Sequence, residues 1–318
     1  AVESQPQGSR KERRAASVLI RAGVSNHVGT RRGYNCLLTG ELTRRWGGRR
    51  RIERWQIRHA ICAAMALKFD VGFSEDENLK WRKSMEDTHV IQVPFMDNSS
   101  GFFAVYDGHG GKEAADLASV ELHKFLELEL AKAGSNVKDS FIAAYEKMDD
   151  RLKFDALYMG ATAVTCLIRE ESGKRRLYAA NAGDARAVLC RGDKAIRLTF
   201  DHKASDPEEQ ARVTASGGWV SMNRVHGVLA VSRALGDHAM KQSVISEPHF
   251  WEDDLSGEDT FVIIACDGLW DVCSDQESVD LIKNMDSAQA MSHALMQAAL
   301  DGGGKDNITV MVVKWSAA

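Results

Sequence analysis

The chain has 318 residues, of which 44% are hydrophobic and 27% are charged, and these values exclude collagen-like and low-complexity classes for the chain as a whole. The formal net charge of −4 conceals an asymmetry, because residues 1–67 carry 14 basic against 4 acidic side chains and the remainder carries 27 against 41. A basic segment therefore precedes an acidic domain. Any anionic ligand of that domain would need local cations, which metal ions supply.

The six cysteines include no CxxC pair, and Cys166, Cys190 and Cys266 lie inside apolar runs, where a free cysteine behaves as a small hydrophobe. We therefore expect a reducing compartment and no disulfide framework. The longest apolar stretch, Ala60–Leu67, is far shorter than the roughly 20 residues of a membrane-spanning helix. We expect no membrane span and no cleavable signal.

Residues 1–67 contain arginine clusters at 10–14, 31–32, 44–45 and 49–51. We interpret this segment as a solvated, mostly disordered extension. The alternatives are a targeting segment or a contact with nucleic acid or anionic lipid. An organelle transit peptide is also arginine-rich, but it contains few acidic residues, and this segment has four glutamates. We expect a cytoplasmic or nuclear protein, or both, with organelle targeting as the alternative.

Residues 68–318 alternate between patterns typical of strands and of helices, and we interpret them as one domain. Short polar links, such as 171–174 and 192–193, predict hairpins and antiparallel pairing. The order predicts an α+β fold, a four-layer α-β-β-α sandwich of two antiparallel sheets flanked by helices. The expected strands are 69–74, 88–95, 101–107, 161–168, 176–181, 185–190, 194–199, 248–252, 261–267 and 308–315, and the expected helices are 111–132, 137–156, 207–216, 275–285 and 287–300.

Four of the apolar runs carry acidic residues at one end. If 88–93 and 102–106 pair about the polar turn 97–101, Asp87 lies opposite Asp107. Like charges repel, and burying them unpaired is costly, so we interpret the acids as a metal site. The acids are Glu86 and Asp87 before the run 88–93, Asp107 after 102–106, Asp267 after 261–266, and Asp306 before 308–313.

Oxygen-only ligands select hard cations, here Mg²⁺ or Mn²⁺, with Ca²⁺ as a further alternative. The sequence has no HExxH or CxxC set for zinc. Two ions that share a carboxylate can activate a water molecule between them, and Asp107 is the expected bridge. Gly108 follows it and lets the backbone carbonyl approach the site without a side chain in the way.

Several further residues have two interpretations on sequence alone. His109 is a structural histidine or, beside a metal cluster, a general acid for a poor leaving group. Arg82 is a surface charge or part of the same site. Asp184 is a turn residue between two strands or a site residue, and Asp271 caps a helix or supports the site. We also expect Arg186 and Arg233 to pair with acids.

Taken together, the chain resembles the metal-dependent Ser/Thr protein phosphatases of type 2C. Each matching stretch alone is a weak signal, but seven in the family's order, spread over about residues 69–315, are specific. The stretches are Arg82–Asp87, Phe103–Gly111, Gly160–Val164, Asn181–Arg186, Leu229–Asp237, Cys266–Val272 and Lys305–Asn307.

The resemblance implies hydrolysis of phosphoserine and phosphothreonine on proteins by direct attack of a metal-activated water. It implies two Mg²⁺ or Mn²⁺ ions per subunit, to which some members of the family add a third, weaker ion. By resemblance, Asp107, Asp267 and Asp306 hold one ion, and Glu86, Asp107 and the Gly108 carbonyl hold the other.

The remaining roles also follow from the resemblance. Arg82 binds the substrate phosphate, which suits a guanidinium fork, and His109 is the general acid. Asp184, with or without Asp267, matches the position linked to the third ion of some members, and Asp87, Asp237 and Asp271 are further candidates for that ion or for supporting the site. For Asp237, metal binding and bracing of its loop both remain open.

The segment 205–235 matches the family's flap, which borders substrate and varies among members. Ala161, Ala204 and His226 depart from frequent family residues, and the last two concern substrate preference rather than chemistry. The partners implied are phosphoprotein substrates, and a monomer is expected by resemblance.

Rival functions fit less well. No cysteine has an arginine six positions later, and the HRD and DFG motifs of kinases are missing. A non-catalytic scaffold would have lost metal ligands, and nucleic-acid binding is expected only through residues 1–67.

Overall fold

The computed structural model describes residues 40–46, 49–55 and 69–315, and it divides into two units, 1–64 and 65–318. In the first unit, β1 (Gly40–Trp46) and β2 (Arg49–Trp55) pair antiparallel. This pair was not predicted. The rest of the interpretation of residues 1–67 as an extension or targeting segment lies outside the described residues.

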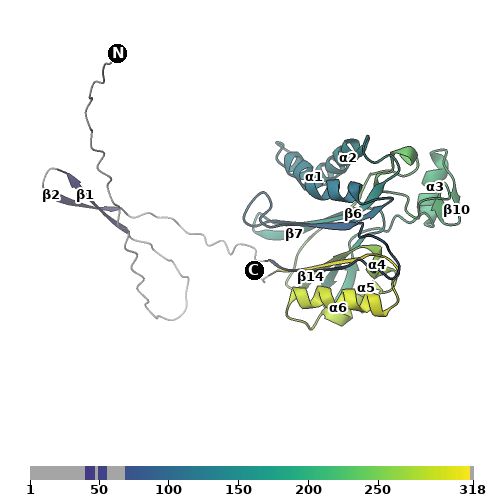
Figure 1. Ribbon diagram of the computed structural model, residues 1–318. Helices are drawn as coiled ribbons and strands as arrows, with labels where there is room; N and C mark the ends of the chain where they lie inside the picture. Colours follow the sequence, from purple (N-terminus) through teal and green to yellow (C-terminus); the bar gives the residue numbers. More distant parts are fainter. Residues whose placement is uncertain (1–39, 47–48, 56–68, 316–318) are drawn as a thin grey trace, which may run out of the picture. The chain divides into compact units, whose positions relative to one another are not determined.

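Two antiparallel sheets stack face to face in the second unit (Figure 1). The strand order is β13-β7-β6-β5-β4 in the first sheet, with β12 beside β6, and β3-β15-β14-β8-β9 in the second. The first sheet contains β4 (Asp87–Gln92), β5 (Gly101–His109), β6 (Gly160–Glu171), β7 (Lys174–Ala182), β12 (Leu235–Gly236) and β13 (His249–Asp254), and the second contains β3 (Phe69–Asp76), β8 (Arg186–Arg191), β9 (Lys194–Arg197), β14 (Asp259–Ala265) and β15 (Ile308–Trp315).

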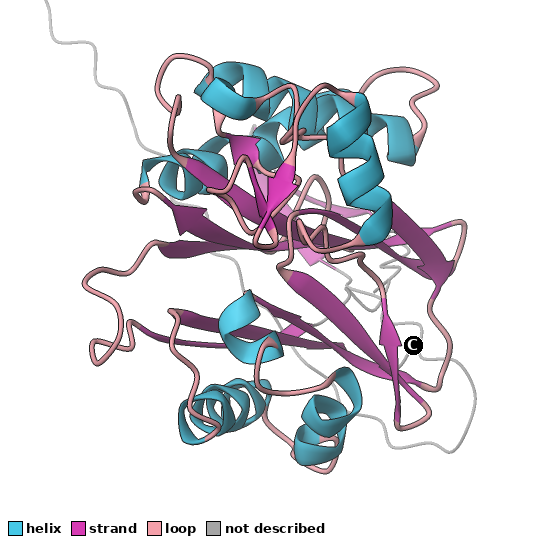
Figure 2. Ribbon diagram, turned by 90° about the vertical axis from the view of Figure 1, so that its right-hand side faces the viewer, coloured by secondary structure: helices cyan, strands magenta, loops and turns pink. Residues whose placement is uncertain are grey.

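Helices cover the outer face of each sheet (Figure 2). The first sheet packs against α1 (Glu113–Leu130) and α2 (Val137–Leu152). The second packs against α4 (Asp267–Trp270), α5 (Asp275–Ile282) and α6 (Ala288–Asp301). The predicted four-layer sandwich is confirmed. No helix in the described part of the chain is both long and apolar enough to cross a membrane.

The two-residue period of a strand explains why both faces of the sheets are apolar. On β5, Phe102 and Tyr106 pack toward α1 and α2, whereas Phe103 and Val105 pack toward the other sheet. Asp107 continues the series of Phe103 and Val105. Its side chain therefore lies at the end of the core between the sheets.

Local signals at the helix starts explain several boundaries. Asn136 caps α2, Ser287 caps α6, and Ser274 forms a capping box with Glu277 at α5, so unpaired backbone N–H groups of each first turn find acceptors.

Several predicted ends were too long, and four of them have a clear local cause. The expected helices 137–156 and 275–285 end at 152 and 282, where Lys153 and Lys283 close the last turn with backbone bonds. The expected strand 88–95 ends at 92, because Pro94 has no N–H for the ladder. The expected strand 261–267 ends at Ala265, where its partner β8 begins, and Asp267 starts α4.

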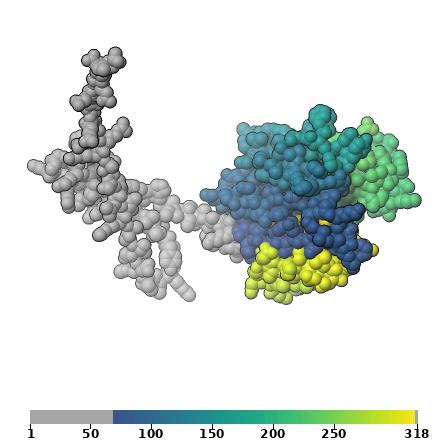
Figure 3. All heavy atoms as spheres, viewed as in Figure 1, coloured from purple at the N-terminus to yellow at the C-terminus, as the bar shows by residue number. Residues whose placement is uncertain are grey.

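The flap, residues 205–235, contains α3 (Pro207–Ala215) and the two-residue strands β10 (Val220–Ser221) and β11 (Arg224–Val225). It forms a lobe at the edge of the domain (Figure 3, green) and is followed by the short helix η1 (His238–Met240). Strands this short show no periodicity, so the sequence did not predict them. Its own small core consists of Ala204, Val213, Val225, Val231, Ala234 and Val244.

One carboxylate fastens the flap. Glu209 on α3 is only 3% exposed and accepts hydrogen bonds from Arg212, Ser232 and Arg233, so the expectation that Arg233 pairs with an acid is confirmed. Burial opposes ionisation, but the bonds from Arg233, Arg212 and Ser232 outweigh it and hold the pKa of Glu209 well below its usual value. The ion pair therefore ties α3 to the chain that leads into β12.

We predict that Glu209→Gln lowers the free energy of unfolding by about 3 kcal/mol, because two guanidinium groups lose their buried counter-charge. Since the pKa of Glu209 is depressed, its contribution is present above the unfolded value of 4.5 and is lost as pH falls below it. Urea unfolding at neutral and acidic pH measures both effects. The exposed neighbour Glu208 provides the control. An equally large loss of unfolding free energy in Glu208→Gln would contradict the prediction.

Candidate metal centre

Three carboxylates from separate segments converge at one end of the sandwich. Asp107 lies on β5, Asp184 lies in the link between β7 and β8, and Asp267 begins α4. Each offers an oxygen, and these oxygens lie within 4.8 Å of one another. The resemblance assigns Asp107 and Asp267 to one ion and Asp184 to a third. In the structure the three carboxylates lie together.

Asp87 completes the acidic neighbourhood. It pairs directly with Asp107 in the β4–β5 ladder, so the register predicted from the polar turn is confirmed. Burial is the main cause that raises the pKa of Asp87 to about 6, and burial together with the neighbouring acids raises the pKa of Asp107 and Asp267 well above the usual range. The site therefore resists carrying its full negative charge without cations.

The donors fit a hard divalent cation. Asp267 Oδ1 is buried and has no hydrogen-bond partner among the described residues. Buried polar atoms in folded proteins are normally satisfied, and a bound cation would satisfy this oxygen. Because every converging donor is a carboxylate oxygen, Mg²⁺ or Mn²⁺ suits the set better than a softer metal.

Asp306 lies outside the tight trio. Its carboxylate pairs with Arg82, whose side chain is 47% exposed, although its charge still helps to raise the pKa of Asp107 and Asp267. Arg82 therefore lies at the rim of the acidic cluster, where an incoming anion can reach it.

Asn307 holds this rim in place, a role that the sequence analysis missed. Its Nδ2 donates to the carbonyls of Glu77 at 2.8 Å and Ser84 at 3.1 Å, and its Oδ1 accepts from Glu86 N at 3.0 Å. The segment that carries Arg82 is thereby fastened to the start of β15. The signal in the sequence was that Asn307 follows Asp306 within the stretch Lys305–Asn307, which gives no role to its side chain.

Glu86 approaches the site through its backbone. Gly108 N donates to the Glu86 carbonyl at 3.2 Å, and a Cβ on Gly108 would lie 2.5 Å from that oxygen. Glycine is required here because the backbone just before β4 passes so closely. The Glu86 carboxylate accepts from Gly111 N at 3.3 Å and does not belong to the trio.

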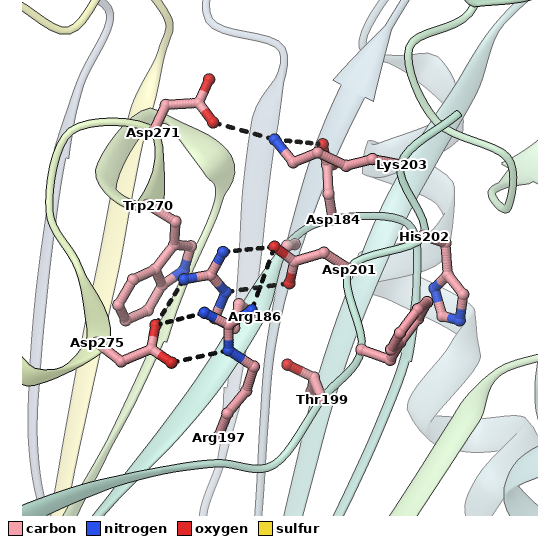
Figure 4. Close-up of polar contacts among 12 residues, drawn as sticks. Asp184, Arg186, Arg197, Thr199, Asp201, His202, Lys203, Trp270, Asp271 and Asp275 are labelled. Atoms are coloured by element: carbon pink, nitrogen blue, oxygen red, sulfur yellow. Dashed lines mark hydrogen bonds and ion pairs between the residues drawn. The ribbon is translucent and has the colours of Figure 1, made fainter. Parts of the chain in front are cut away.

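A lysine that the sequence analysis also missed bridges two of the acids. Lys203 Nζ lies 3.0 Å from Asp271 Oδ1 and 3.4 Å from Asp184 Oδ2 (Figure 4). The Asp271 side chain thus pairs with a lysine, whereas Ser274 caps the following helix. Asp184 is buried, and burial is the main cause that raises its pKa.

Behind these acids, a charged network links the second sheet to α5. Arg186 donates to Asp201 and Asp275, Arg197 also donates to Asp275, and the Arg186 guanidinium lies over the Trp270 ring (Figure 4). The expectation that Arg186 pairs with acids is confirmed. The network holds the ends of β8 and α4 against each other.

His109 is the last residue of β5. Its Nε2 lies 2.7 Å from Oδ2 of Asp237, which immediately follows β12. Of the two interpretations left open for Asp237, the contact with His109 favours bracing over metal binding.

We predict that the metal-free protein becomes less stable as pH rises from about 4 to 6, because the folded carboxyl groups keep protons that unfolded ones, with a pKa of 3.8, release. Mg²⁺ should therefore raise the melting temperature more at about pH 7.5 than at about pH 5. In chelator, Asp267→Asn should melt about 2–4 °C above wild type for each 1 kcal/mol of repulsion relieved.

Thermal unfolding with chelator and with Mg²⁺ measures these shifts. The exposed carboxylate of Asp286 provides a control, because Asp286→Asn should leave both the chelator and the Mg²⁺ melting temperatures unchanged. An equal Mg²⁺ response in wild type and Asp267→Asn would count against a metal at this site.

Comparison with known proteins points to one family. The family profile described as Protein phosphatase 2C matches residues 71–308. Protein phosphatase 2C homolog 1 of Schizosaccharomyces pombe is 45% identical over 251 residues, covering 76% of this chain and 72% of the relative. The protein of the same name in Saccharomyces cerevisiae is 39% identical over 266 residues, covering 78% of this chain and 94% of the relative.

Solved structures share the fold. A Caenorhabditis elegans sex determining protein matches with a TM-score of 0.69 at 25% identity, covering 77% of this chain and 64% of that one. A phosphatase from a pathogenic strain of Toxoplasma gondii matches with a TM-score of 0.68 at 21% identity, covering 79% of this chain and 93% of that one.

Proposed function

Because the chain belongs to the protein phosphatase 2C family, we propose that it hydrolyses phosphoserine and phosphothreonine on proteins by direct attack of a metal-activated water. It is a metal-dependent serine/threonine protein phosphatase, and phosphoproteins are its substrates. The observation that carries the proposed mechanism is the convergence of Asp107, Asp184 and Asp267 at the open end of the sandwich.

Two Mg²⁺ or Mn²⁺ ions would share Asp107. In this proposal Asp267 and Asp306 complete the ligands of one ion, and Glu86 with the Gly108 carbonyl completes those of the other. When bound, the ions lower the pKa of a water molecule and neutralise charge on the phosphoryl group. The raised pKa of Asp107 supports this assignment, because a cation is what the ionised form lacks.

A third, weaker ion would use Asp184 and Asp271. Lys203 already places a positive charge between these two carboxylates, which agrees with weak binding there. Asp87 supports Asp107 across the ladder rather than binding an ion by itself.

Arg82 is proposed to hold the substrate phosphate. Its guanidinium is half-exposed at the rim and is held by Asp306 alone among the described carboxylates. A planar guanidinium can bind two phosphoryl oxygens at once, and exchange of Asp306 for phosphate would draw the substrate against the acidic cluster.

His109 is proposed to protonate the leaving oxygen. A serine or threonine alkoxide is a poor leaving group, so a positioned proton donor lowers the barrier. His109 lies two residues after Asp107 on β5 and therefore shares its face of the sheet.

We take residues 68–318 as the catalytic domain. The role of residues 1–67, as a disordered extension, a targeting segment or a contact with nucleic acid or anionic lipid, stays a prediction from the sequence, as do the compartment and the monomeric state.

We predict that turnover of a phosphothreonine peptide requires added Mg²⁺ or Mn²⁺ and that Asp107→Asn nearly abolishes it with the fold retained, because the shared ligand is lost. Steady-state kinetics with and without chelator measure this, with circular dichroism as the check on folding. Asp286→Asn is the matched surface control. Undiminished turnover in excess chelator would refute the metal mechanism, and a folded, metal-binding but inactive wild type would favour a scaffold.

We predict that His109→Ala slows hydrolysis of a phosphothreonine peptide by about 10²-fold or more and hydrolysis of p-nitrophenyl phosphate much less. The nitrophenolate leaves without a proton donor, whereas the alkoxide does not. The ratio of kcat values for the two substrates is the measurement. Equal losses on both substrates would remove His109 as the general acid.

A further inference from the structure

A fully buried acid outside the carboxylate cluster contacts the proposed general acid. Asp237 is 0% exposed, and its Oδ2 lies 2.7 Å from Nε2 of His109. Its other oxygen, Oδ1, is buried without a hydrogen-bond partner in the described part of the chain. Burying a charged carboxylate in this way is costly. The contact with His109 is the side-chain interaction of Asp237 that offsets part of this cost.

The first sheet is built to allow this contact. Gly160 on β6 pairs with His109 on one side and with Gly236 on the other, so Asp237 arrives beside His109 from a strand that is not adjacent to β5. A Cβ on Gly160 would lie 2.1 Å from Asp237 Oδ2 and 2.5 Å from His109 Nε2. The contact between Asp237 and His109 therefore passes over Gly160, where a side chain would block it.

The backbone of Asp237 is held as firmly as its side chain. Its φ of 52° lies in the left-handed region, which aspartate tolerates better than most residues. Its N–H donates to the Met159 carbonyl at 2.8 Å, and the preceding Gly236 N donates to Asp149 Oδ1 at 2.8 Å. Lys241 also binds Asp149, so the loop is braced from behind.

We infer that Asp237 is a positioning residue that sets the orientation and the tautomer of His109, an inference that rests on the proposed general-acid role. A carboxylate only accepts hydrogen bonds, so the Nε2 of His109 carries a proton and donates it to Asp237. Nδ1 is then the nitrogen that is left for the substrate. Among the described residues Nδ1 has no hydrogen-bond partner, and the side chain is 24% exposed.

The path of the proton during hydrolysis follows from this geometry. As water oxygen bonds to phosphorus, the bond from phosphorus to the serine or threonine oxygen breaks, and that oxygen keeps the electron pair. It takes the proton from Nδ1 of the imidazolium, which becomes a neutral imidazole that still donates Nε2–H to Asp237. The protons of the attacking water stay on the phosphate product, which releases one to solvent, and a proton from solvent returns to Nδ1.

The test compares two buried aspartates that support the same loop. Asp237→Asn should lower kcat for a phosphothreonine peptide by about 10²-fold and kcat for p-nitrophenyl phosphate by less than about 3-fold. Asp149→Asn removes a carboxylate that braces the loop without touching His109, so its ratio of the two rates should equal that of wild type. Equal losses on both substrates in Asp237→Asn would overturn the inference.

A double-variant cycle isolates the coupling. Because Asp237 acts through His109, Asp237→Asn combined with His109→Ala should be no slower on the peptide than His109→Ala alone. Multiplied losses would mean that Asp237 has a separate structural role, which also overturns the inference. Calorimetric Mg²⁺ binding should be unchanged in Asp237→Asn, and a lost ion would make Asp237 a metal ligand instead.

An imidazole ¹H–¹⁵N spectrum of the Mg²⁺-loaded wild type gives a readout that needs neither variant nor turnover. The neutral ring of His109 should carry its proton on Nε2, and a proton on Nδ1 would overturn the inference even if Asp237→Asn fails to fold. If the Nε2 proton is present but the wild type does not hydrolyse the peptide, the proposed function fails and the catalytic meaning of the pair fails with it.

Discussion

Repulsion among buried carboxylates at one end of the sandwich is the constraint on which the rest of the structure depends. Asp107, Asp184 and Asp267 lie too close together to ionise freely, and burial raises the pKa of each. Such a cluster lowers stability unless cations join it. The same repulsion would favour the binding of divalent ions, so in the proposed mechanism metal affinity comes at the expense of metal-free stability.

Holding the acids against one another requires a stiff frame. The two sheets are buried on both faces, which fixes where β5 and β14 end. Arg186 and Asp275 then tie β8 to α5, and Asn307 ties β15 to the segment before β4. These contacts are fully paired, unlike the cluster that they surround. The favourable contacts of this frame thus offset the electrostatic cost of holding the carboxylates together.

Cations of the chain itself already compensate part of the charge. Lys203 bridges Asp184 and Asp271, and Arg82 pairs with Asp306. The Arg82 pair lies outside the trio, whereas Lys203 contacts the trio through Asp184. An incoming phosphate can compete for Arg82, and an incoming ion can compete with Lys203, so binding at the rim and binding in the centre are electrostatically linked.

A single strand connects the metal chemistry to the proton chemistry. Asp107 and His109 lie two residues apart on β5 and share a face of the sheet. Each is then fixed by an acid from elsewhere: Asp87 lies opposite Asp107, and Asp237 contacts His109. This spacing means that a shift in the register of β5 would disturb both halves of the proposed reaction together.

The sequence by itself determined the layers of this protein and much of the acidic cluster. Alternating apolar residues and short polar turns are local signals, so they predicted the antiparallel sheets and placed Asp87 opposite Asp107. Only the tertiary structure decided which charges meet across the molecule. Lys203 reaches Asp271, and Asp237 reaches His109 from 128 positions away, because separate segments pack side by side. No pattern within a strand or a helix encodes such neighbours, since they depend on how whole elements come together.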